Sequence, residues 1–151
     1  MFRGEYHHSL DAKWRFIVPA RLRDELGDKF IITKGFEGCL FIYGMKEWEA
    51  LEEKFNDLRV TDEGARHFGR FFIGSAFEAE SDGQGRTILP LSLREYAGIT
   101  KEIVSTGVGK RIEIWSKERW IDYTGKINVN LNRDANLVNE ELSKKMFELG
   151  I

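Results

Sequence analysis

The chain has 151 residues, of which 42% are hydrophobic and 32% charged. This predicts one domain, or two very small ones, with a hydrophobic core, and excludes a disordered chain. Basic and acidic residues nearly balance at 23 and 25, and the net charge of -2 gives no sign of an overall basic protein. The single cysteine, Cys39, excludes an internal disulfide framework and a cysteine-based zinc finger.

Apolar runs in the sequence are short. The longest, such as 30–32 and 39–43, fall far below the roughly 20 residues that cross a membrane. The N-terminal residues contain no apolar signal region. We therefore expect a soluble cytoplasmic protein with no membrane partner.

The sequence contains an internal repeat. Residues 11–27 align with 82–98 with seven identities, and after one inserted residue the similarity continues to Trp48 and Trp120. Each repeat has only about 40 residues, too few to hold a core alone, so we expect the two to pack as a pseudo-twofold pair. The predicted boundaries are 5–48 for the first repeat unit, 49–75 for a helical linker, 76–120 for the second repeat unit and 121–151 for a C-terminal helical region.

The first repeat is predicted to form a β-β-α-β-β unit. Its strand, turn, strand, helix and two further strands follow in chain order: 5–10, 11–14, 15–18, 20–26, 30–33 and 39–43. The first two strands are expected to pair as a hairpin. The helix is bounded by Pro19 at its start and Gly27 at its end.

The second repeat has the same order of elements. Its strand, second strand, helix and two further strands are predicted at 77–80, 86–89, 90–97, 103–106 and 111–115. A glycine-containing turn at 107–110 is expected to join the last two strands, as 34–38 does in the first repeat. Apolar spacings of three and four predict added helices at 48–58, around 65–72 and at 138–149. A shorter helix is also expected at about 117–124, after the second repeat. The expected fold class is therefore α+β and rich in β-structure.

No group of residues in the sequence supports catalysis or metal binding. His7 and His8 are adjacent on a strand and point to opposite faces, and Cys39 lies in an apolar strand as a small core residue. The segment 107–110 (Gly-Val-Gly-Lys) lacks the spacing and the following helix of a phosphate-binding loop. We therefore expect no enzyme, no cofactor and no metal.

Both predicted loops carry an Asp-x-x-x-Arg motif, Asp11 with Arg15 and Asp82 with Arg86. One interpretation is an ion pair that only shapes the loop, worth at most about 1 kcal/mol when exposed. The other is that each loop presents a guanidinium group, which suits phosphate contact and guanine recognition. Trp14 lies in the first loop and adds a stacking surface.

The motif residues and several longer stretches resemble the MraZ family of bacterial transcriptional regulators, within the AbrB/MazE-like swapped-hairpin class. The matching stretches are 1–6, 9–13, 15–19, 82–86, 93–98 and 107–115. Trp14 departs from the family pattern, which usually has glycine there. The resemblance implies two AbrB-like units related by pseudo-twofold symmetry and a homo-oligomeric closed ring.

The resemblance also implies a function. The family regulates transcription, usually as a repressor, by binding short direct repeats in the promoter of the cell-division and cell-wall gene cluster. It thus implies double-stranded DNA as the partner and a nucleoid-associated location. Four basic residues are expected to contact the DNA: Arg3, Lys13, Arg15 and Arg86. Asp11 and Asp82 are expected to orient the loops.

An alternative function remains open from the sequence. Members of the swapped-hairpin class also bind other proteins, so the chain could be an antidote-like or scaffold module without specific DNA binding. A gel shift that compares the DNA upstream of its own gene with a scrambled fragment distinguishes the two.

Overall fold

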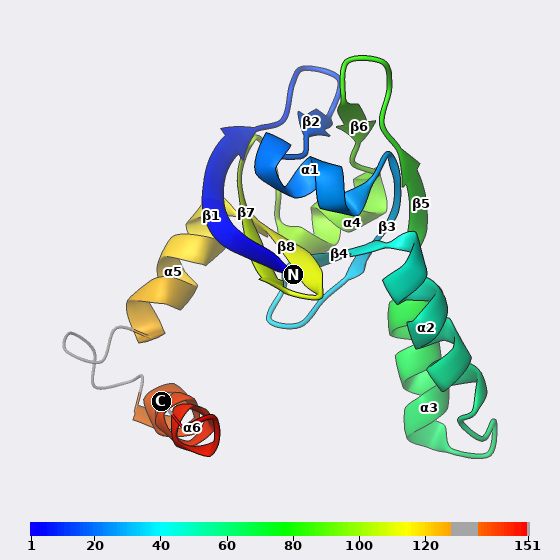
Figure 1. Ribbon diagram of the computed structural model, residues 1–151, viewed down its shortest axis with the longest axis vertical. Coiled ribbons are helices and arrows are strands. Elements are labelled where there is room, and N and C mark those ends of the chain that lie inside the picture. Colours follow the sequence, from blue (N-terminus) through cyan, green and yellow to red (C-terminus); the bar gives the residue numbers. More distant parts are fainter. Residues whose placement is uncertain (128–135, 151) are drawn as a thin grey trace. The chain divides into compact units, whose positions relative to one another are not determined.

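A computed structural model describes residues 1–127 and 136–150 of the chain (Figure 1). The chain divides into an N-terminal body, residues 1–116, and a C-terminal body, residues 117–151. The C-terminal body contains helices α5 (Lys117–Ile127) and α6 (Asn136–Glu148), where the sequence predicted helices. None of the helices in the described part of the chain is both long and apolar enough to span a membrane.

The N-terminal body is built on two antiparallel sheets. The larger sheet has the strand order β1-β7-β8-β4-β3-β5 and the smaller one pairs β2 with β6. The strands of the first repeat are β1 (Phe2–Ser9), β2 (Arg15–Ile17), β3 (Lys29–Lys34) and β4 (Leu40–Gly44). Those of the second are β5 (Phe77–Glu80), β6 (Arg86–Ile88), β7 (Glu102–Gly109) and β8 (Arg111–Ser116).

The two repeats exchange strands. The first strand of each repeat pairs with the third strand of the other, β1 with β7 and β5 with β3, while β2 pairs with β6 and β4 with β8. This pattern is unchanged when the repeats are interchanged, which is the pseudo-twofold relation expected from the duplication. The family model described below matches the chain in two segments, so the tandem swapped-hairpin fold is confirmed.

The prediction that strands 5–10 and 15–18 pair with each other is wrong. The turn between them does form, since the Asp11 N–H donates to the Arg15 carbonyl at 2.8 Å, but β1 and β2 then pair with different strands of the second repeat. Turn chemistry fixes the local reversal of the chain. The pairing partner is set by where the strands can bury their apolar residues, which the local sequence does not reveal.

The predicted turn at 107–110 is shorter than expected. Gly107 lies inside β7, opposite Gly4 of β1, and the reversal occurs after Gly109, whose φ is 72°. A β-carbon on Gly107 would lie within 3 Å of backbone atoms of Phe2 and Arg3. The glycine therefore permits close approach of the exchanged strand rather than the turn itself.

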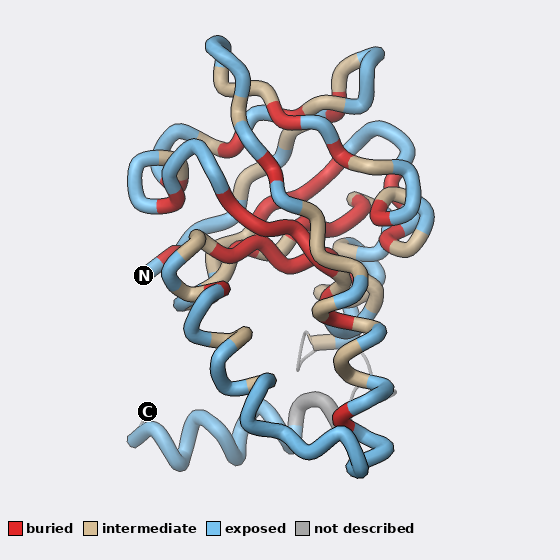
Figure 2. Tube along the Cα trace, turned by 90° about the vertical axis from the view of Figure 1, so that its right-hand side faces the viewer, coloured by how far each residue is buried: buried red, intermediate tan, exposed pale blue. Residues whose placement is uncertain are grey.

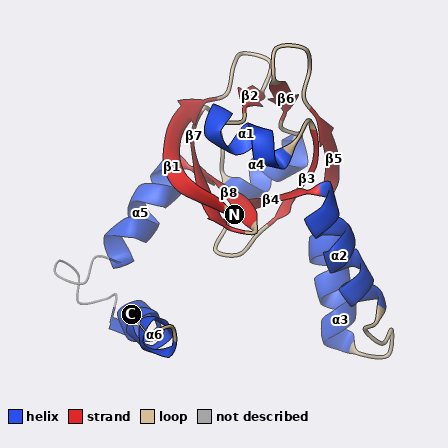
Figure 3. Ribbon diagram, viewed as in Figure 1, coloured by secondary structure: helices blue, strands red, loops and turns tan. Residues whose placement is uncertain are grey.

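Two short helices complete the repeats, α1 (Ala20–Leu26) and α4 (Leu91–Ala97), each preceded by proline and followed by glycine as predicted. Their buried residues join those of the strands in one apolar cluster, and Figure 2 shows buried positions concentrated along these strands. The large core side chains include Phe16, Phe30, Ile32, Leu89, Leu93 and Ile114. Figure 3 shows α1 and α4 surrounded by the strands of the two sheets.

The segment between the repeats is helical. It contains α2 (Met45–Asn56), α3 (Glu63–Phe68) and a π-helical turn, η1 (Gly69–Ile73). Asp62 caps α3 through hydrogen bonds from the N–H groups of Gly64 and Ala65. The buried Thr33 hydroxyl donates to the Phe72 carbonyl at 2.6 Å, which attaches η1 to strand β3.

Candidate nucleic-acid interface

The two motif-bearing loops, 11–14 and 82–85, project from the same end of the N-terminal body (Figures 1 and 2). Strands β2 and β6 hold them there, because these strands continue directly from the loops and pair with each other. In their register Arg15 lies opposite Ile88, and Ile17 lies opposite Arg86. The exchange of strands thus places the two arginines on one short two-stranded ribbon, formed by residues 15–17 of β2 and 86–88 of β6.

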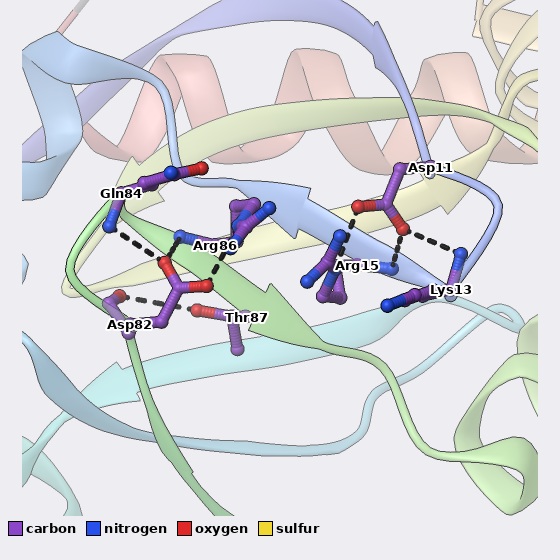
Figure 4. Close-up of polar contacts among 8 residues, drawn as sticks. Asp11, Lys13, Arg15, Asp82, Gln84, Arg86 and Thr87 are labelled. Atoms are coloured by element: carbon purple, nitrogen blue, oxygen red, sulfur yellow. Dashed lines mark hydrogen bonds and ion pairs between the residues drawn. The ribbon is translucent and has the colours of Figure 1, made fainter.

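The first loop is organised around the carboxylate of Asp11 (Figure 4). Its Oδ1 accepts hydrogen bonds from the backbone N–H groups of Lys13 and Arg15, both at 2.9 Å. Its Oδ2 accepts a hydrogen bond from Nε of Arg15 at 2.7 Å. One carboxylate therefore closes the loop and directs the guanidinium group.

The second loop has the same geometry (Figure 4). Asp82 Oδ1 accepts from the backbone N–H groups of Gln84 and Arg86 at 2.9 Å, and Oδ2 accepts from Nε of Arg86 at 2.8 Å. The distances match those of the first loop to within 0.1 Å for each equivalent bond. The spacing of four residues in Asp-x-x-x-Arg is what allows one side chain to reach both the turn and the arginine.

These hydrogen bonds keep both aspartates ionised. The pKa of Asp11 is lowered, chiefly by the hydrogen bond from the Arg15 backbone N–H, and that of Asp82 is lowered chiefly by the corresponding bond from Arg86. Donors to a carboxylate favour its charged form. The loop geometry is therefore intact at neutral pH.

Each arginine retains donors for a partner. Nε of Arg15 and of Arg86 is used within the loop, while the Nη atoms of both make no hydrogen bond to any residue that the structure describes. The side chains are 26% and 32% exposed. A guanidinium that is held through Nε can still offer two Nη–H groups to a phosphate or to the O6 and N7 atoms of guanine.

Trp14 stands in the first loop at the position that Gly85 occupies in the second. Its φ is 62°, close to the 79° of Gly85, the equivalent residue of the second repeat. The Arg94 guanidinium lies 4.1 Å from the centre of the indole ring, and Nε of Arg94 donates to the Leu89 carbonyl at 2.8 Å. A left-handed tryptophan costs about 1–2 kcal/mol, and stacking on arginine offsets part of that cost.

The other two predicted basic residues lie in different places. Lys13 is exposed in the first loop, beside Arg15 (Figure 4). Arg3 lies near the start of β1, whereas the loop follows the end of that strand. Six residues of strand between Arg3 and Ser9 span about 20 Å. The structure thus brings Lys13 and both loop arginines together, but it does not bring Arg3 to them.

Sequence reasoning missed three residues of this surface. Arg94 stacks on Trp14, and Ile17 and Ile88 are 45% and 52% exposed on the ribbon. The repeat alignment gives a signal for Arg94, because it matches Arg23 of the first repeat. The exposed isoleucines alternate with buried Phe16 and Thr87, an alternation that three-residue strands are too short to reveal.

The groups considered for metal binding or nucleophilic chemistry lie apart from one another or are occupied by other contacts. Cys39 is fully buried, and desolvation raises the pKa of its thiol. His7 contacts Glu5 at 2.7 Å, while His8 contacts Ser105 at 2.7 Å. Within residues 1–127 and 136–150, no group of three or more His, Cys, Asp or Glu side chains could hold a metal ion.

The chain is similar to known proteins over its whole length. The family described as "MraZ protein, putative antitoxin-like" matches residues 1–71 and again residues 72–139. A protein named transcriptional regulator MraZ from Clostridium beijerinckii is 51% identical over 151 residues, which is 100% of both chains. Proteins of the same name from Clostridium tetani and Carboxydothermus hydrogenoformans are 50% and 49% identical, over 100% and 98% of both chains.

These matches confirm the resemblance drawn from the sequence motifs. The similar proteins are named as transcriptional regulators and not as enzymes, in agreement with the expected absence of catalysis. The chain belongs to the MraZ family of transcriptional regulators.

Proposed function

We propose that this transcriptional regulator binds double-stranded DNA in a sequence-specific manner through its two Asp–Arg loops. Arg15 and Arg86 contact the DNA, Lys13 assists, and Asp11 and Asp82 orient the arginines. A DNA contact by Arg3, predicted from the sequence, remains a prediction and would have to involve a surface away from the loops.

One observation carries this proposal: the same charge-assisted geometry occurs twice, on adjacent strands of one ribbon. An ion pair that merely stabilised a turn would not require both arginines to present their Nη groups at the same end of the body. Two oriented guanidinium groups suit a DNA duplex, whose phosphates and guanine edges are both good partners for arginine.

The net charge of -2 suggests that a single protomer binds DNA weakly. We propose that protomers assemble into a closed homo-oligomeric ring, so that several loops engage one DNA molecule. Linked sites gain affinity through effective concentration, and short direct repeats are the natural target of such an array. The proposed target is the promoter of the cell-division and cell-wall gene cluster, where the protein acts as a repressor, in the cytoplasm and associated with the nucleoid.

The test is a binding titration near physiological salt, with DNA from upstream of the protein's own gene and a scrambled fragment of equal length. We expect stepwise, preferential binding of the native fragment. The Arg15→Ala/Arg86→Ala variant is expected to bind about tenfold or more weakly, since a bidentate arginine contact is worth about 1–3 kcal/mol.

A matched control removes two arginines from another surface of the same body. Arg59 and Arg70 are exposed in the helical segment between the repeats, so Arg59→Ala/Arg70→Ala changes the net charge equally. We expect the control to bind almost as the wild type does. Equal loss in both variants would mean that charge alone, and not the loops, drives binding.

The alternative function is a module that binds another protein without specific DNA binding. It is favoured by the wording of the family description, which calls the family antitoxin-like. Equal, weak binding of native and scrambled DNA would support this alternative and refute the proposed site.

A further inference from the structure

We propose that Ile17 and Ile88 recognise thymine methyl groups in the DNA major groove. This inference rests on the proposed DNA-binding function and deepens it, because it names a base that the ribbon distinguishes. It concerns two residues outside the Asp-x-x-x-Arg motif.

The ribbon has a buried and an exposed face. Phe16 and Thr87, at the centre of β2 and β6, are 2% and 1% exposed. Residues on either side of them point to the opposite face, because side chains alternate along a strand. Ile17 and Ile88 therefore lie on the outward face, at 45% and 52% exposure.

The outward face contains the loop arginines as well as the isoleucines. The register pairs Arg15 with Ile88 and Ile17 with Arg86, so each isoleucine has an arginine across the ribbon and another beside it on its own strand. Cross-strand neighbours on one face are only about 4.5–5.5 Å apart. A partner that contacts the arginines therefore also contacts the isoleucines.

This combination of side chains suits the major groove. The groove admits a two-stranded ribbon, and the C5 methyl group of thymine is the apolar feature that it displays beside the acceptor and donor groups of the bases. Guanidinium groups bind phosphates or guanine, while a branched aliphatic side chain has no hydrogen bond to offer and gains by covering a methyl group. Two exposed isoleucines that alternate with two arginines on one face thus point to thymine next to the arginine contacts.

The two isoleucines are related by the pseudo-twofold relation of the repeats. Ile17 and Ile88 occupy equivalent positions, two residues after Arg15 and Arg86. Each repeat therefore presents the same two side chains for contact with bases, one charged (arginine) and one apolar (isoleucine). A protomer could then cover two thymine methyl groups at once.

The test compares the upstream DNA fragment with the same fragment in which deoxyuridine replaces every thymidine, a change that removes only the methyl groups. Covering one methyl group is worth about a fourfold change in affinity. We expect the wild type to bind the uracil fragment at least about fourfold more weakly. The Ile17→Ser/Ile88→Ser variant is expected to bind both fragments equally, and Ile17→Val/Ile88→Val is expected to retain the preference.

A control variant checks that the effect belongs to the ribbon. Val60 is 81% exposed between α2 and α3, so Val60→Ser removes an exposed aliphatic group elsewhere and should leave the thymine preference unchanged. Thermal unfolding of each variant establishes that it is folded. The wild-type comparison needs no variant, so it tests the inference even if the serine variant fails to fold.

The outcomes separate this inference from the function on which it rests. Equal wild-type binding of thymine and uracil fragments, with preference over scrambled DNA intact, overturns the inference alone. A serine variant that keeps the thymine preference also overturns it. If the wild type does not prefer the native thymine fragment over scrambled DNA, the proposed function is refuted, and the inference with it.

Discussion

Replacing both loop aspartates by asparagine distinguishes an orienting role from a purely electrostatic one. In each loop, Oδ1 accepts two backbone N–H groups and Oδ2 accepts Nε–H of the arginine. Asparagine keeps one carbonyl oxygen for the backbone donors, but its NH₂ group would face Nε–H, donor against donor. The substitution therefore preserves the turn and releases the arginine.

The two roles predict opposite effects on DNA affinity. If the carboxylates only add negative charge beside the DNA, then Asp11→Asn/Asp82→Asn removes two unfavourable charges and strengthens binding. If they orient the arginines, each released side chain must lose its rotamer freedom on binding, a cost equivalent to about fivefold to tenfold in affinity per loop. We expect the second result, a weakening of about 25-fold or more for the double variant.

The assay is fluorescence anisotropy with labelled upstream DNA over a series of salt concentrations. Released arginines can still contact phosphates, so the salt dependence should change little while the affinity falls. The single variants should each show about half of the loss in free energy, because the loops have the same geometry. Affinity that is unchanged or increased in the double variant would refute the orienting role of the aspartates.

Three further predictions concern stability. Folding lowers the pKa values of Asp11 and Asp82, so their contribution to stability is present above the ordinary value of 3.8 and is lost as the pH falls through the lower folded value. The difference in unfolding temperature between the wild type and the double asparagine variant should therefore shrink below pH 3.8. Thr33→Val should lower the free energy of unfolding in urea by about 1–3 kcal/mol, since the Phe72 carbonyl loses its buried donor, whereas Thr33→Ser should cost less; equal losses would exclude the hydroxyl as the cause. Trp14→Gly should lower it by about 1–2 kcal/mol, because the lost burial and arginine stacking outweigh relief of the positive φ, and a stabilised variant would contradict this balance.

The local elements could be predicted from the sequence because their signals are local. Pro19 and Gly27 mark the ends of α1, and the Asp-x-x-x-Arg spacing indicates the loops. The pairing of β1 with β7 has no such signal, since hydrogen bonding between distant strands depends on which surfaces can be buried together. The duplication was therefore visible in the sequence, whereas the pairing of β1 with β7 and of β5 with β3 was not predicted.

The candidate site shows the same division. Arg15, Arg86 and their aspartates were predicted from the repeated motif, and the structure brings the two loops to one end of the body. The stacking partner of Trp14 is Arg94, which is 80 residues away in the sequence, so this contact could not be predicted locally. Ile17 and Ile88 become a pair only when β2 and β6 adopt their register.

The strand exchange also determines when the protein can begin to fold. Phe2 pairs with Gly109, so the first strand to be synthesised waits for nearly the last strand of the N-terminal body. Such distant pairing closes a long loop and is intrinsically slow. Until then, β1 and β3 present unpaired edges that could join another chain. A nascent chain halted after the first repeat would lack β6, the strand that pairs with β2. It would therefore have no intact ribbon and would be missing the second Asp–Arg loop.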